Sequence, residues 1–250
     1  MIASLAPGLL ALLTAAPDIA VGIVAVACFA PSLAWLGYFY FKDDYPRAPL
    51  SKLLLAFGGG LIAGPLSLAL YEGIAHVAFY RGLDALEYVP DIHKLIYAIF
   101  AIGLIEEVSK ILVCTWFLRR RELTTRRPID GIVYSSAVAL GFATIENWYA
   151  MVKSGDPEWS RVITLPFMHV LFSALWGVAV GHSLPKRAAR GLVSLGLVLS
   201  IVFHGIYDYI LLSSVASDAM MLLLVLFLWV WMSSAAREAA VLAAREQGSH

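Results

Sequence analysis

The stretch "AIGLIEEVSKILVCTWF", residues 101–117, decides how this chain is to be read. It is apolar enough to cross a membrane, yet it contains Glu106, Glu107 and Lys110. A charged side chain at the centre of a bilayer costs about 2.5–3.5 kcal/mol on insertion scales, so such a group normally faces a partner or a water-filled cavity. The stretch therefore predicts a membrane helix that carries a polar functional site.

The composition of the whole chain supports a membrane protein. Of the 250 residues, 60% are hydrophobic and only 14% are charged, and the mean hydropathy is +0.79. A soluble domain has about 45–50% apolar and about 25% charged residues. The formal net charge is zero, which argues against a nucleic-acid partner because such proteins carry a basic face.

Seven segments are long enough to span a bilayer, which requires roughly 20 apolar residues per helix. Residues 1–17 contain Pro7 and Pro17 and are expected at the membrane surface, unless they form an eighth span. We predict an all-α transmembrane helical bundle in which residues 1–250 form a single integral membrane domain. The predicted spans are 18–41, 53–80, 92–118, 129–152, 162–184, 191–213 and 218–236.

The connections between these spans predict the orientation of the chain. Lys and Arg collect in cytoplasmic connections. On the alternating sides of the predicted bundle the basic residues number 13 and 4. This bias places the N-terminus outside and the C-terminus in the cytoplasm.

Two patches of small residues predict close helix packing. They are "GGGLIAG" at 58–64 and "GVAVG" at 177–181. Small residues let helix backbones approach each other inside lipid, where no hydrophobic drive brings helices together. We interpret both patches as packing surfaces rather than ligand sites.

The ionisable residues inside the spans predict one shared site. At a rise of 1.5 Å per residue, Glu106 lies about 20 Å and His169 about 10 Å from the outer end of its span. Glu146 falls in the outer half and His204 near the middle, so spans three to six can line one site hydrated from the outer face. His182 is expected at the interface, and Glu72 with His76 at the mouth. The full set is Glu72, His76, Glu106, Glu107, Lys110, Glu146, His169, His182, His204 and Asp208.

The spacing of these residues allows several chemistries. His204 and Asp208 are four residues apart, as are Glu106 and Lys110, so each pair lies on one helix face. A carboxylate beside an imidazole fixes its tautomer, or the two together bind a metal ion. Both pairs also have a purely structural interpretation. The Glu106–Lys110 pair could be an ion pair that fixes the helix register, and the His204–Asp208 pair could be a simple hydrogen bond. A cluster of this kind also suits a proton-coupled transporter, which uses buried acids and histidines as a proton relay.

Four motifs on successive spans give the chain a family resemblance. They are "EEVSK" at 106–110, "FATIEN" at 142–147, "HVLFSALWGVAVG" at 169–181 and "HGIYDY" at 204–209. In this order they resemble the PrsW family of intramembrane proteases, over a catalytic core of residues 95–213. The related CAAX-processing and abortive-infection membrane proteases have EExxxR and FxxxH motifs. Lys110 and the pair Glu146-Asn147 depart from those motifs and favour the PrsW branch.

The resemblance implies a membrane-embedded endopeptidase of the bacterial cell membrane. Its partners would be the lipid bilayer and a membrane-anchored protein substrate, similar to an anti-sigma factor that is cut on its extracytoplasmic side. The catalytic residues would be Glu106, Glu107, Glu146, His169 and His204, with Lys110, Asn147 and Asp208 in support.

Two mechanisms fit these residues. In the first, Glu106 or Glu107 removes a proton from water, and His169, His204 or Asn147 donates a hydrogen bond to the oxyanion. In the second, a divalent ion such as Zn²⁺ activates the water. We favour the metal-independent route, because the chain has no HExxH motif. The metal ligands in the second route would come from His169, His204, Asp208 and Glu146.

Overall fold

The computed structural model describes residues 18–42, 48–75, 89–120, 122–123, 128–154, 158–183, 190–213 and 218–247, and every regular element within these ranges is a helix. The all-α prediction is therefore confirmed, and the predicted surface segment 1–17 and His76 lie outside the described residues. In chain order the elements are α2 (Asp18–Lys42), α3 (Leu50–Ala75), α4 (Asp91–Tyr97), η2 (Ala98–Gly103), α5 (Leu104–Arg119), α6 (Pro128–Ser154), α7 (Trp159–Ser183), α8 (Arg190–Leu212) and α9 (Asp218–Gln247).

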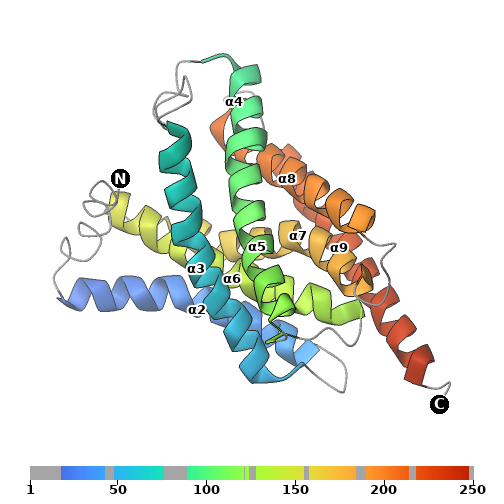
Figure 1. Ribbon diagram of the computed structural model, residues 1–250. Coiled ribbons are helices and arrows are strands. Elements are labelled where there is room, and N and C mark those ends of the chain that lie inside the picture. The colour runs from blue at the N-terminus through green and yellow to red at the C-terminus, as the bar shows by residue number, and fades with distance from the viewer. Residues whose placement is uncertain are drawn as a thin grey trace.

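Each predicted span overlaps a helix, although α9 continues to Gln247, past the predicted end at residue 236. In the part of the chain that the structure describes, six helices are long and apolar enough to cross a membrane, namely α2, α3, α6, α7, α8 and α9. The remaining segment, α4–η2–α5, carries the charged residues of the opening stretch and forms one continuous rod between α3 and α8 (Figure 1). That this rod is the seventh span, and that the N-terminus lies outside, remain predictions.

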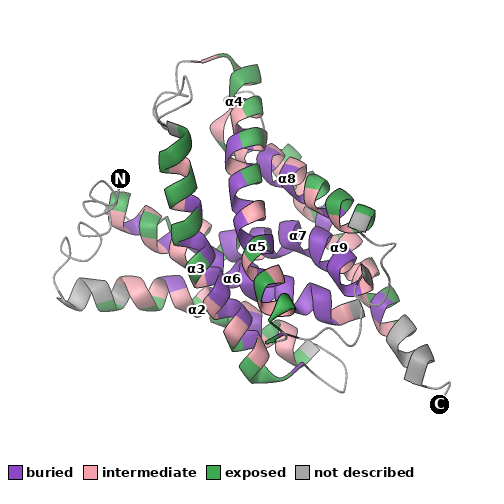
Figure 2. Ribbon diagram, in the orientation of Figure 1, coloured by how far each residue is buried: buried purple, intermediate pink, exposed green. Residues whose placement is uncertain are grey.

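The centre of the bundle is the pair α6 and α7. Of their apolar segments 83% and 78% of the residues are buried, against 17% for α2 and 11% for α9 (Figure 2). The "GVAVG" patch lies in this interface: a Cβ on Gly131 would overlap the backbone of Gly177 and Gly181. The predicted packing role of that patch is therefore confirmed.

The "GGGLIAG" patch packs α3 against α6 in the same way. A Cβ on Gly60 would overlap the carbonyl oxygen of Val138, and one on Gly141 would overlap that of Phe57. Gly64 lies against the side chain of Ile145. Because the two backbones touch, α3 is held in a fixed register beside the polar centre of the bundle.

A π-helix precedes the glutamate pair, and it packs against α8. A Cβ on Gly103 would lie 2.5 Å from the carbonyl oxygen of Ile201, and one on Gly205 would lie 2.5 Å from the Cα of Ile99. The backbones of η2 and α8 are thus in direct contact one turn from both Glu106 and His204. Single turns of π-helix inside α-helices occur frequently at functional sites.

Candidate active site

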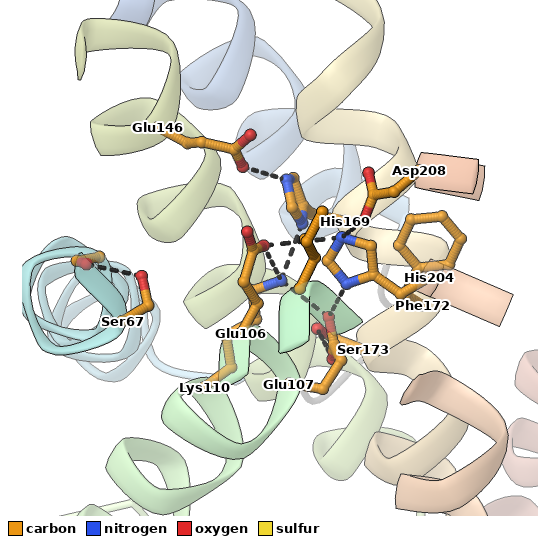
Figure 3. Close-up of polar contacts among 12 residues, drawn as sticks. Ser67, Glu106, Glu107, Lys110, Glu146, His169, Phe172, Ser173, His204 and Asp208 are labelled. Carbon is orange, nitrogen blue, oxygen red and sulfur yellow. Dashed lines mark hydrogen bonds and ion pairs between the residues drawn. The ribbon is translucent and has the colours of Figure 1, made fainter. Parts of the chain in front are cut away.

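Side chains from α5, α6, α7 and α8 converge on one polar cluster in the middle of the bundle (Figure 3). Helix α5 contributes Glu106, Glu107 and Lys110, and the three other helices contribute histidines and carboxylates. All residues of the cluster are almost completely buried except Glu146 and Asp208, which lie at its edge and are partly exposed. The members from the other helices are Glu146, His169, His204 and Asp208.

Glu107 is the most completely bonded member of the cluster. Its Oε1 accepts hydrogen bonds from Lys110 Nζ at 2.7 Å and from His204 Nδ1 at 3.0 Å. Its Oε2 accepts three more, at 2.8–3.0 Å, and the side chain has no exposed surface. A carboxylate offers about four lone-pair sites, so Glu107 has no capacity left for a substrate. The donors to Oε2 are Ser173, Trp176 and Ser200.

The bond from Glu107 fixes the tautomer of His204. Because a carboxylate only accepts, Nδ1 of His204 must carry the proton, and the neutral ring therefore has its lone pair on Nε2. That nitrogen lies 3.6 Å from Oε2 of Glu106 and 3.5 Å from Oδ2 of Asp208. Phe172 stacks on the ring, with centroids 4.7 Å apart and planes 14° from parallel, and holds its orientation.

Glu106 and Asp208 each present a buried oxygen that has no hydrogen-bond partner among the described residues. These atoms are Oε2 of Glu106 and Oδ2 of Asp208. The other oxygen of Glu106 accepts a hydrogen bond from the phenol of Tyr71 at 3.0 Å. Buried polar groups are normally satisfied, because leaving one unpaired costs about 1–3 kcal/mol. Together with Nε2 of His204, these two oxygens make three acceptor atoms that converge on one place, where a hydrogen-bond donor or a cation would satisfy them.

His169, in contrast, has both ring nitrogens engaged. Lys110 Nζ lies 2.8 Å from Nδ1, and because an ammonium group only donates, Nδ1 is the acceptor. Nε2 then carries the proton and donates it to Oε2 of Glu146 at 2.7 Å. Lys110 also lies over the ring of Phe142, 4.1 Å from its centroid, which adds a cation–π contact.

Arg161 joins the cluster from the first turn of α7. Its guanidinium donates to Oε1 of Glu146 through Nη2 and to Oδ1 of Asn147 at 3.3 Å through Nη1. Asn147 is fully buried and donates to the carbonyl oxygen of Val162 at 3.3 Å. The structure therefore does not bring Asn147 to the histidines, and it uses the Glu146-Asn147 pair to connect α6 with α7.

Two further residues singled out by sequence, Glu72 and His182, are more exposed than the buried glutamates and histidines of the cluster. Glu72 is exposed on α3. Nδ1 of His182 lies 2.9 Å from the carbonyl oxygen of Val178 in its own helix, consistent with the position expected near the end of the span.

The donor set of the cluster fits a divalent metal ion. Ligand atoms of Glu106, His169 and His204 lie within 4.8 Å of one another. Oδ2 of Asp208, which has no hydrogen-bond partner among the described residues, faces the imidazole of His204. Two histidines and a carboxylate are a ligand set that Zn²⁺ accepts in enzymes. If both histidines are neutral and all four carboxylates are ionised, the charges of Lys110 and Arg161 leave the cluster two negative charges in excess. His169 would have to exchange one of its present partners to bind the ion.

Comparison with known proteins agrees with the family predicted from the four motifs. Residues 48–233 match the family model described as "PrsW family intramembrane metalloprotease". The "Protease PrsW" of Geobacillus kaustophilus is 32% identical over 203 residues, which cover 80% of this chain and 84% of the relative. That of Bacillus subtilis is 28% identical over 216 residues, covering 81% and 89% respectively. That of Clostridioides difficile is 29% identical over 211 residues, covering 80% and 84%.

No solved structure matches the chain. The family match covers every helix that contributes to the polar cluster, and the apolar helices identify an integral membrane protein. This chain therefore belongs to the PrsW family of intramembrane proteases.

Proposed function

We propose that this protein is a membrane-embedded endopeptidase that hydrolyses peptide bonds at the group formed by Glu106, His204 and Asp208. The observation that carries the proposal is the pair of unpaired buried oxygens, Glu106 Oε2 and Asp208 Oδ2, on either side of His204 Nε2. A water molecule there would find acceptors for both of its protons. Family membership supports hydrolysis over the alternative of a proton-coupled transporter.

In this mechanism Glu106 is the general base. It accepts a proton from the water on Oε2, and the water oxygen forms a bond to the scissile carbonyl carbon. Glu106 then returns the proton to the departing amine as the carbon–nitrogen bond breaks. General acid–base catalysis of this kind contributes about 10²- to 10⁴-fold to a rate.

Glu107 and His204 have different parts in the same step. Glu107 is bonded on all sides, so we assign it a positioning role: it holds Nδ1–H of His204 and aims Nε2 at the reacting atoms. If the neutral imidazole takes up a second proton from solvent on Nε2, next to Asp208, the resulting imidazolium would be the donor to the oxyanion. Removing one such donor typically costs about 2.7–4 kcal/mol of transition-state stabilisation.

The metal in the family's description is compatible with these residues. Glu106, His204 and Asp208 would hold it, with His169 as a further ligand. A bound Zn²⁺ ion would act as a Lewis acid and would lower the pKa of a coordinated water to about 7. Glu107 would orient His204 in the same way with or without the ion, as partners of ligating histidines generally do.

Exposure within the cluster indicates the side from which substrate enters. The side chains of Glu146 and Asp208 are 26% and 17% exposed, whereas those of Glu106 and His204 are 7% and 2% exposed. By the predicted orientation, the more exposed end faces the outer half of the membrane. We propose that the substrate is a membrane-anchored protein, similar to an anti-sigma factor, that presents an extracytoplasmic segment to this opening.

A reconstituted assay tests this function. Purified protein in liposomes is incubated with a single-span reporter, and cleavage is followed for the wild type and for Glu106→Gln. Metal content and the effect of a chelator are measured on the same preparation. We expect cleavage by the wild type alone. Proton flux without cleavage would overturn the assignment and support the transporter.

A further inference from the structure

We infer that Tyr71 of α3, a residue outside the four predicted motifs, is a positioning residue that orients the catalytic carboxylate Glu106. The inference rests on the function proposed above. Its basis is the hydrogen bond from the Tyr71 phenol to Oε1 of Glu106 at 3.0 Å. The phenol also lies 3.4 Å from the carbonyl oxygen of Ile102, near the end of the π-helix.

This contact determines which oxygen of Glu106 is left for chemistry. A phenol has one proton, and the shorter distance assigns it to Oε1. The carboxylate is thereby rotated so that Oε2, the atom without a partner, faces His204 and Lys110, each 3.6 Å away. Without the phenol, nothing else among the described residues bonds Oε1, and the carboxylate is free to turn.

The packing of α3 explains how Tyr71 comes to this position. Gly60, Gly64, Ser67 and Tyr71 follow one another at spacings of three or four residues, so they lie on a single face of the helix. The glycines bring that face against α6, and Ser67 is buried and donates to the carbonyl oxygen of Gly64 at 2.7 Å. Figure 3 shows α3 at Ser67 beside the α5 segment that carries Glu106. Tyr71 is the residue at which this close-packed face reaches the cluster.

A kinetic comparison provides the first test. In Tyr71→Phe the carboxylate loses one charge-assisted hydrogen bond while the ring remains. We expect kcat for reporter cleavage to fall about tenfold or more, with KM within about twofold. Tyr38→Phe, on α2 where the ring packs against Trp35 and Phe39, is the matched control and should retain wild-type kinetics. Wild-type kcat in Tyr71→Phe, or a change in KM alone, would overturn the inference.

A spectroscopic measurement tests the contact without relying on activity. Fluorotyrosine incorporated at position 71 keeps the hydroxyl group, and its ¹⁹F resonance reports the hydrogen bond. We expect this resonance to shift in Glu106→Gln and to stay in place in Asp91→Asn, a control on α4 whose carboxylate pairs with Lys94. An unchanged resonance in Glu106→Gln would refute the contact. If the wild type failed to cleave any reporter, the proposed function would fall, and this resonance would still decide whether Tyr71 holds Glu106.

Discussion

The two adjacent glutamates of α5 lie in different parts of the cluster. We call the fully buried part around Glu107 the inner half, and the more exposed part with Glu106 and Asp208 the outer half. In the inner half, Glu107 receives five hydrogen bonds and has no exposed surface. In the outer half, Glu106 and Asp208 each keep an oxygen without a partner. A fully bonded carboxylate stabilises an arrangement, whereas an unpaired one retains the capacity to bind something else. The comparison separates the carboxylate that holds the site together from the two that we propose to react or to bind a metal ion.

The largest expected effect comes from the outer half. Glu106→Gln keeps the shape and the acceptor for Tyr71 but removes the base. We expect reporter cleavage to fall about 10²- to 10⁴-fold. The free energy of unfolding in detergent should fall less than in the Glu107 variant below, because Oε2 of Glu106 accepts no hydrogen bond and lies 3.6 Å from Lys110 Nζ. Substantial cleavage by this variant would assign the proton transfer to another group.

In the inner half we expect a substitution to lower the stability of the protein as well as its activity. Glu107→Ala leaves the ammonium of Lys110 buried without its closest anion, and breaking a buried ion pair costs about 3–5 kcal/mol. We therefore expect a large loss of unfolding free energy, together with a loss of activity. Unfolding of the Glu106 and Glu107 variants under identical conditions measures the contrast. Equal stability of the two would erase the distinction between the halves.

Asp208→Asn tests the second unpaired oxygen. The change preserves the size of the side chain and removes its charge beside Nε2 of His204. Loss of a residue that supports a ligand or a catalytic imidazole costs about 10- to 100-fold in metal affinity or activity. Cleavage rate and Zn²⁺ binding by isothermal calorimetry are the measurements. A variant that retains both would remove Asp208 from the site.

Arg161→Gln is expected to have a smaller effect. The side chains of the Arg161–Glu146 ion pair are 27% and 26% exposed, so water reaches and screens the pair, and solvent-accessible pairs contribute about 0.2–1 kcal/mol. Cleavage should therefore fall by less than about fivefold. Arg237→Gln on α9, a cation outside the cluster, is the matched control. A loss as large as that of Glu106→Gln would mean that Arg161 contacts the substrate.

The smallest effect is expected at His182. Its ring is bonded within its own helix, so His182→Ala should cleave the reporter at close to the wild-type rate. His204→Ala, measured beside it, should lose most of its activity, because it removes the imidazole at the centre of the cluster. Similar rates for the two variants would contradict the site described here.

Much of the fold could be predicted from the sequence because a membrane helix is recognisable from its own run of apolar residues. Runs of apolar residues separated by polar connections place all seven helical segments near their observed positions. The same reasoning identified the buried acids, the two histidines and Lys110 of the cluster, since an ionisable group stands out in an apolar run. The glycine patches were also readable, because close packing in lipid depends on small residues.

What the sequence did not reveal depends on contacts between distant segments. The π-helix at 98–103 has no local signature, and its position reflects the backbone contact between Gly103 and α8. Arg161 was counted among the basic residues of a connection, and only the fold shows that it reaches Glu146. Tyr71 is one of 11 tyrosines, and nothing in its neighbourhood distinguishes it. The spacing to Lys110 predicts that the two glutamates differ, but which of Glu106 and Glu107 is the more completely bonded was unreadable, because they are adjacent and chemically identical.

The set of donors around Glu107 has a consequence for biogenesis. They come from α5, α7 and α8, three helices that are separate in the sequence and must pack together before the contacts exist. Until the last of these helices has docked, His204 is not yet held by Glu107 and the polar cluster is incomplete. On the function proposed above, a newly made chain would become competent for hydrolysis only when the bundle has closed.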